Sequence, residues 1–150
     1  MERRNAWLSY NEADEKALEK LAKDYRTFLD NGKTERECVS ELSREAEAAG
    51  YVSLDKKLAS GEKIQTGDKI YAVGMKKIMA LFYIGEDPME KGMNILGAHI
   101  DSPRLDVKQN PLYEDTDLAY LDTHYYGGVK KYHWVALPLA IHGVIVKKDG

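Results

Sequence analysis

The spacing of apolar residues changes after Gly50, and this change constrains the fold more than any other feature of the sequence. Before that residue, apolar side chains recur at three- and four-residue steps, the period of one helical face. Between residues 11 and 31 this face consists of Leu18, Leu21, Ala22, Tyr25 and Leu29. After Gly50 the apolar residues gather in short runs typical of strands. The order therefore predicts an α/β protein in which helices cover a mixed sheet.

The amino-terminal part carries start and stop signals for two helices. Asn31-Gly32 is a C-terminal stop for the first helix, expected over residues 11–31. Thr34 and Glu37 have the spacing of a capping box, in which each side chain binds a free backbone amide. Gly50 suits the left-handed position after a second helix over residues 35–49. Cys38 falls on the apolar side of that helix, so we expect a buried packing residue and not a nucleophile.

Strands are expected after Gly50. Residues 69–73 and 78–84 are two β-rich runs separated by a short turn, which predicts adjacent antiparallel strands. Residues 85–92 predict a loop, and residues 93–98 predict a buried strand that runs directly into His99. A last strand is expected over residues 137–148. It meets Asp149-Gly150, a dipeptide that normally turns a hairpin, so we expect the chain to be a fragment of a longer protein.

Composition narrows the partners of the chain. Its 22 basic and 25 acidic residues give a net charge of −3, which predicts no strong attraction to nucleic acid or to an anionic membrane. The sequence shows no apolar run long enough to cross a bilayer and no region resembling a signal peptide. A single cysteine cannot form an internal disulfide, which agrees with a reducing compartment. We therefore expect a cytoplasmic protein whose partner is a small molecule or another protein.

His99 and Asp101 are the candidate site residues. Alternate side chains of a strand share a face, so these two are expected to point the same way from the end of the strand over residues 93–98. A neutral imidazole is a good zinc ligand, and a nearby carboxylate can hold its tautomer through the other ring nitrogen. Gly97 allows close backbone approach before the histidine, and Pro103 fixes the chain after the aspartate. The pattern predicts a metal site.

Residues 97–108, with the sequence GAHIDSPRLDVK, closely resemble the first metal-binding motif of the aspartyl aminopeptidase family. The resemblance also covers residues 70–85 and, more loosely, residues 125–128 and 137–150. The resemblance implies a zinc aminopeptidase in which His99 binds one of two zinc ions per subunit, with cobalt or manganese as alternative metals, and Asp101 orients His99. The family's other ligands and its glutamate base are expected beyond these 150 residues, so the chain alone should be inactive.

The resemblance also implies a division of the chain and a set of partners. Residues 1–136 would form the N-terminal part of the catalytic domain, and residues 137–150 a strand entering an inserted β-rich domain for oligomer assembly. The substrates would be peptides cleaved after their first residue, and the protein would be a homo-oligomer. Residues 130–138 replace a Trp-x-Asp-Arg stretch of many relatives, which is typical of a bacterial branch. The family's preference for acidic amino-terminal residues is therefore not carried over.

Two alternatives remain open. One is a related tetrahedral aminopeptidase with a similar His-x-Asp entry, and the other is a noncatalytic assembly or binding module that retains the motif as structure. Metal binding by the intact protein separates the enzymes from the module. His124, His133 and His142 lie in contexts that favour structural roles. Ser102 lacks the glycine-framed turn of serine hydrolases, and Gly127-Gly128 lacks the spacing and the lysine of a phosphate loop.

Overall fold

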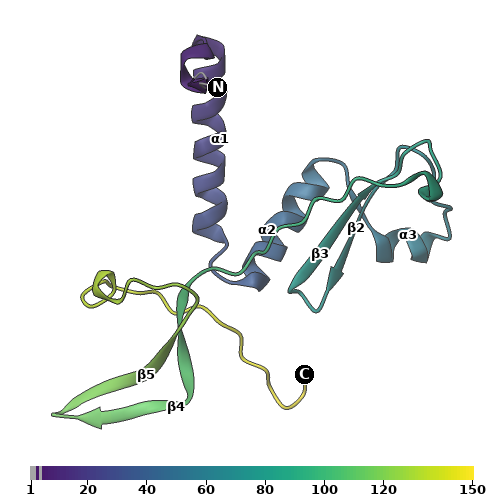
Figure 1. Ribbon diagram of the computed structural model, residues 1–150. Coiled ribbons are helices and arrows are strands. Elements are labelled where there is room, and N and C mark those ends of the chain that lie inside the picture. The colour runs from purple at the N-terminus through teal and green to yellow at the C-terminus, as the bar shows by residue number, and fades with distance from the viewer. Residues whose placement is uncertain (1–2, 4) are drawn as a thin grey trace. The chain divides into compact units, whose positions relative to one another are not determined.

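The computed structural model describes residue 3 and residues 5–150 (Figure 1). The chain divides into two compact units, Met1–Ile95 and Leu96–Gly150. The elements of the first unit are η1 (Ala6–Ser9), α1 (Glu12–Asn31), α2 (Glu35–Ala48), β1 (Val52–Ser53), α3 (Leu54–Ser60), β2 (Lys69–Gly74), β3 (Ile78–Tyr83) and η2 (Met89–Lys91). Those of the second unit are β4 (Arg104–Asp115), β5 (Leu118–Tyr126) and η3 (Lys131–His133). Helices and a mixed sheet confirm the predicted α/β class.

Both predicted helices are present, and side-chain caps fix where they begin. At the start of α1, the Asn11 side chain accepts hydrogen bonds from the backbone N–H groups of Ala13 and Asp14, and the Asp14 carboxylate accepts one from the Asn11 N–H. At α2, the Thr34 hydroxyl accepts from the Glu37 N–H, and the Glu37 carboxylate accepts from the Thr34 N–H at 2.9 Å. The predicted capping box is confirmed, and it satisfies amides that a helix start leaves unpaired.

β2 is the central strand of a three-stranded mixed sheet. β1 runs parallel to it, with Val52 opposite Ile70, and β3 runs antiparallel, with Ala72 opposite Ala80. β2 and β3 are the two antiparallel strands that the sequence predicts. The sequence does not predict β1 and α3. A strand of two residues and a helix of seven residues are both too short to show a clear apolar period.

The buried core of the first unit lies where α2 packs beside β2 (Figure 1). Its members are Cys38, Val39 and Ala46 from the helix and Ile70 and Tyr71 from the strand. The burial of Cys38 confirms the prediction. Loss of solvent raises the pKa of the Cys38 thiol, and the neighbouring Glu37 and Glu35 raise it further. A thiol that keeps its proton is a poor nucleophile, so the environment fits a packing role.

Two predicted strands are wrong. Residues 93–98 and 137–147 are irregular, and their side chains are largely exposed, as Leu96 and Ile145 illustrate at 99% and 94%. The physical reason is pairing, because a strand needs a neighbour for its backbone N–H and C=O groups and an apolar run does not supply one. The dipeptide Asp149-Gly150 does lie in a turn, which a hydrogen bond from the Gly150 N–H to the Lys147 carbonyl closes.

The second unit is built on an antiparallel hairpin that the sequence does not predict. β4 and β5 pair from Arg104 opposite Tyr126 to Asp115 opposite Leu118. Thr116 and Asp117 form the connection with positive φ angles of 51° and 61°, the backbone of a tight two-residue hairpin turn. The register shifts between Val107 and Leu112, a stretch containing a proline that has no N–H to donate.

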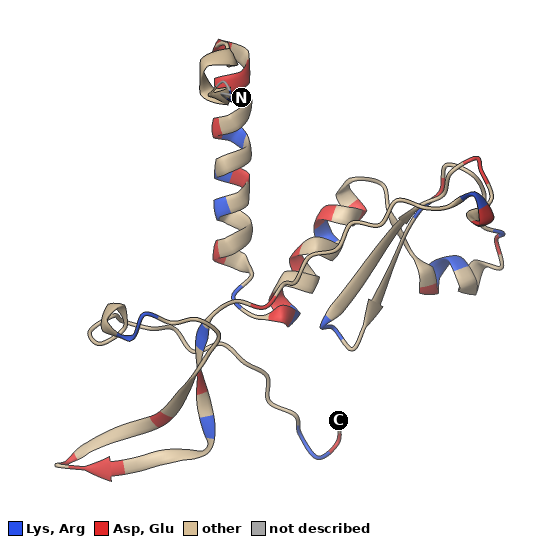
Figure 2. Cartoon of the chain, in the orientation of Figure 1, with Lys and Arg blue, Asp and Glu red and all other residues tan. Residues whose placement is uncertain are grey.

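Acidic and basic residues both occur along α1, α2 and α3 (Figure 2). On α1, Lys20 and Asp24 form an ion pair of 2.8 Å at the four-residue spacing of neighbouring turns. Within the described residues, no helix combines the length and the apolar character that a membrane span requires.

Candidate metal centre

The candidate site lies in the second unit, on the irregular segment that leads into β4. The His99 side chain is 83% exposed, and that of Asp101 is 35% exposed. The His99 Nδ1 atom lies 3.2 Å from Asp101 Oδ1 and 3.1 Å from the Asp101 carbonyl oxygen. The proximity expected from the His-x-Asp spacing is therefore present, although the backbone around it is not the predicted strand.

The contacts of His99 decide where its proton lies. A carboxylate oxygen and a backbone carbonyl oxygen both accept hydrogen bonds and have no proton to give. The Nδ1 atom near both must therefore carry the N–H in the neutral imidazole. This leaves the lone pair on Nε2, the form in which histidine binds a metal ion. The exposed His99 ring can therefore bind a cation such as zinc through Nε2.

Tyr126 completes the surroundings of Asp101. Its hydroxyl donates a hydrogen bond of 2.6 Å to Asp101 Oδ2, the oxygen that His99 does not contact. This hydrogen bond is the main reason that the pKa of the Asp101 carboxyl lies below its usual value, and the nearby His99 lowers it further. The aspartate is therefore held as a carboxylate with both oxygens engaged.

The hairpin ladder brings Tyr126 to this position from 25 residues away. Tyr126 pairs with Arg104 across β4 and β5, and the guanidinium lies 4.2 Å from the tyrosine ring centre. Arg104 Nε also donates to Asp106 at 2.7 Å. Gly127 follows with φ of 74°, and a Cβ there would lie 3.4 Å from the Cα of Pro103. The two chain segments are thus close at Pro103 and Arg104, shortly after Asp101.

Sequence reasoning missed Tyr126. The tyrosine lies in the stretch 125–128 that loosely resembles the aspartyl aminopeptidases, but its hydrogen bond depends on the register of a hairpin that the sequence does not predict. A glycine at Thr116 or Asp117 would have indicated a tight turn and so the pairing of β4 with β5, but neither position has one.

His124 and His133 have contacts of their own. His124 Nδ1 lies 3.4 Å from the Tyr125 carbonyl oxygen, and the His133 ring packs edge-on against Tyr132 at 4.2 Å. His142 lies in the irregular carboxyl-terminal segment. Among the described residues, no group of three or more His, Cys, Asp or Glu side chains is arranged to hold a metal ion. This part of the molecule therefore offers His99 as one ligand, and not a complete centre.

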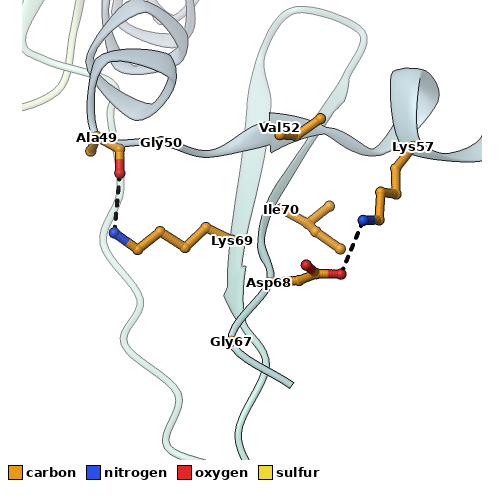
Figure 3. Close-up of a pocket in the computed structure, with 8 residues that line it drawn as sticks. All are labelled: Ala49, Gly50, Val52, Lys57, Gly67, Asp68, Lys69 and Ile70. Carbon is orange, nitrogen blue, oxygen red and sulfur yellow. Dashed lines mark hydrogen bonds and ion pairs between the residues drawn. The ribbon is translucent and has the colours of Figure 1, made fainter. Parts of the chain in front are cut away.

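A pocket in the first unit is lined by Ala49, Gly50, Val52, Lys57, Gly67, Asp68, Lys69 and Ile70 (Figure 3). Its two cationic side chains are occupied by neighbours. Lys57 Nζ lies 3.2 Å from Asp68 and 3.3 Å from Glu62, and Lys69 Nζ donates to the Ala49 carbonyl at 3.1 Å. These contacts connect the start of β2 to α3 and to the end of α2. They indicate that Lys57 and Lys69 stabilise the fold.

Comparison with known proteins places this geometry in a family. The family model described as aminopeptidase I zinc metalloprotease (M18) matches residues 28–150. The chain therefore belongs to this family of zinc metallopeptidases, which confirms the resemblance carried by residues 97–108.

Several relatives match over nearly the whole chain. A probable M18 family aminopeptidase 1 from Clostridium acetobutylicum is 58% identical over 149 residues, which is 99% of this chain and 32% of the relative. The corresponding protein from Thermotoga maritima is 43% identical over 150 residues, which is 100% of this chain and 32% of the relative. The chain thus spans about a third of the length of these curated relatives.

Solved structures agree with the computed fold. The crystal structure of aminopeptidase I from Clostridium acetobutylicum matches with a TM-score of 0.81 at 58% identity, covering 100% of this chain and 33% of that one. An M18 family aminopeptidase from Thermotoga maritima matches with a TM-score of 0.86 at 42% identity, covering 100% and 32%. The predicted fold class is therefore confirmed by similarity to experimental structures of the same family.

Proposed function

We propose that this chain supplies His99 as a zinc ligand to an aminopeptidase that removes the first residue of peptides. The observation that carries the proposal is the contact of His99 Nδ1 with Asp101, which leaves Nε2 for a metal ion, in a chain of a zinc metalloprotease family. The relatives that match the whole chain are described as probable aminopeptidases. Because the chain spans about a third of their length, the activity is proposed for the intact protein.

Each residue of the site has a distinct task in this proposal. His99 holds the metal ion through Nε2, and Asp101 keeps the ring in the correct tautomer by accepting the Nδ1 proton. Zinc, when bound, would polarise the peptide carbonyl and make a bound water a nucleophile near neutral pH. Two zinc ions per subunit form part of the proposal, with cobalt or manganese as alternatives, and the missing ligands and general base come from outside the described residues.

The proposal extends to assembly and location. Apolar side chains of the carboxyl-terminal segment are exposed, including Ile141 at 77% and Val146 at 80%, and Leu21 on α1 is 67% exposed. Such surfaces need cover from further chain or from another copy, which supports a homo-oligomer and the assignment of residues 137–150 to the entrance of an inserted domain, after a catalytic part over residues 1–136. A single reduced cysteine supports a cytoplasmic location.

The test measures zinc content and release of amino-terminal residues by the intact protein, with His99→Ala compared to His124→Ala. We expect His99→Ala to abolish this release and to lower the zinc content, because among the described residues no other imidazole contacts Asp101. His124→Ala, a change of the same kind on an exposed strand, should retain both. Full activity and unchanged zinc in His99→Ala would contradict the proposal, and zinc bound without hydrolysis by the wild-type protein would favour the binding-module alternative.

A further inference from the structure

The hydrogen bond between Tyr126 and Asp101 has a role that the proposed ligand alone does not explain. We propose that Tyr126 is a positioning residue for the metal site: its hydroxyl fixes the Asp101 carboxylate, and the carboxylate fixes the His99 ring. This inference rests on the proposed function of His99 and adds a residue on another strand to it. Tyr126 itself lies behind the aspartate and is not proposed to touch the metal ion or the substrate.

The Asp101 carboxylate is held at both of its oxygens. Asp101 uses Oδ1 for His99, at 3.2 Å, and Oδ2 for Tyr126, at 2.6 Å. A hydroxyl that donates to a carboxylate at such a distance forms one of the stronger hydrogen bonds in proteins. Because His99 contacts one oxygen and Tyr126 the other, rotation of the carboxylate would break one of these two contacts. The tyrosine thus restricts the group that in turn holds His99.

Tyr126 is held in position by the hairpin. Its place is set by the pairing of β5 with β4, where Tyr126 lies opposite Arg104. The Arg104 guanidinium lies over the ring at 4.2 Å, a cation–π contact that adds to the pairing. Asp101 precedes β4 by three residues, so the ladder carries the hydroxyl to the carboxylate. The donor is therefore positioned by regular structure, while the ligand it serves lies on an irregular segment.

The hydrogen bond between Tyr126 and Asp101 can be removed without unfolding the hairpin. Tyr126 is 38% exposed and the Asp101 side chain is 35% exposed, so their hydrogen bond competes with water and contributes little to overall stability. A Tyr126→Phe change removes the hydroxyl and keeps the ring and its contact with Arg104. Such a change should leave the hairpin paired while it removes the restraint on Asp101. The role is thus testable without unfolding the site.

The experiment measures the affinity of the intact protein for zinc by competition with a chelator, for the zinc ion whose binding His99→Ala removes. We expect Tyr126→Phe to weaken this affinity about 10-fold, the low end of the range for partners that orient metal ligands. The matched control is Tyr125→Phe, because Tyr125 is the adjacent tyrosine, is 54% exposed and faces Lys131. It should bind zinc as the wild type does, and circular dichroism should show the same fold for both variants.

A double-mutant cycle with Asp101→Ala tests whether the tyrosine acts through the aspartate. If it does, Tyr126→Phe should have no further effect on zinc affinity once the carboxylate is gone, whereas independent effects would multiply. Equal weakening in the presence and absence of Asp101 would overturn the inference. So would wild-type zinc affinity in Tyr126→Phe while His99→Ala still loses zinc, and that result would leave the proposed function intact. A wild-type protein that binds no zinc would overturn both.

Discussion

The two compact units differ in what holds them together. Every buried apolar residue of the described chain, from Cys38 to Tyr71, belongs to the first unit and lies on α2 or β2. In the second unit the order around the candidate site comes from the β4–β5 ladder and from polar contacts such as those of Asp101 and Arg104. The buried core that stabilises the fold therefore lies in the first unit, and the candidate metal ligand lies in the second. Changes in one unit should leave the property of the other unaltered.

The largest expected effect tests the core of the first unit. Ile70 is 2% exposed and lies on β2, the central strand of the sheet, so Ile70→Ala should lower the free energy of unfolding by about 2–5 kcal/mol, through lost burial and a cavity. Val73→Ala on the same strand is the control, because Val73 is 40% exposed and should cost much less. Urea titration followed by circular dichroism measures both. Equal losses in the two variants would mean that the core is not where the structure places it.

The next largest effect is expected on zinc binding, with no change in the free energy of unfolding. Asp101→Asn should weaken zinc binding by the intact protein about 10–100-fold, because an amide can present its N–H₂ group to His99 and no longer fixes the ring proton on Nδ1. Asp122→Asn is the control, since Asp122 pairs with Lys108 at 2.9 Å on the hairpin and does not contact His99. Isothermal calorimetry gives the affinities. Unchanged zinc affinity in Asp101→Asn would show that the aspartate does not orient His99. A lowered unfolding midpoint in this variant would show that the site residue also contributes to stability.

The smallest effect is a pH dependence confined to the first unit. Tyr71 donates a hydrogen bond of 2.8 Å to Glu47, which lowers the pKa of the Glu47 carboxyl from 4.5, with Lys56 contributing less. The same bond is the main cause of a Tyr71 hydroxyl pKa above 10.0. The hydrogen bond between Tyr71 and Glu47 therefore stabilises the fold fully between pH 4.5 and pH 10.0, the ordinary pKa values of the two groups. This stabilisation fades as pH falls through the lowered pKa of Glu47, or rises through the raised pKa of Tyr71.

Tyr71→Phe should accordingly flatten the acid side of the stability profile, while the ion pair of Glu47 with Lys56 at 3.5 Å keeps some slope. Thermal unfolding midpoints measured from acid to neutral pH check this expectation. Tyr51→Phe serves as a control of equal chemistry, because Tyr51 contacts Lys69 through its ring face and not through a carboxylate. Identical acid limbs in wild type and Tyr71→Phe would contradict the assigned cause.

What could be predicted from the sequence was local. The helix caps at Thr34 and Glu37 and the contact of His99 with Asp101 depend on residues two or three positions apart, and all were expected. The strand over residues 93–98 was wrong because an apolar run does not specify a pairing partner. The β4–β5 hairpin was missed because its turn has no glycine and its register shifts before Leu112. Tyr126 was missed for the same reason, since a contact across 25 residues depends on that register.

The central claim is that His99 is held with its proton on Nδ1 and binds metal through Nε2. Heteronuclear NMR of the imidazole nitrogens in the intact protein tests this claim directly, before and after zinc is added. The account predicts that His99 carries its proton on Nδ1 without metal, and that zinc shifts the His99 Nε2 resonance while His124 stays unchanged. A proton on Nε2 of His99, or His99 nitrogen resonances that zinc does not move, would contradict it.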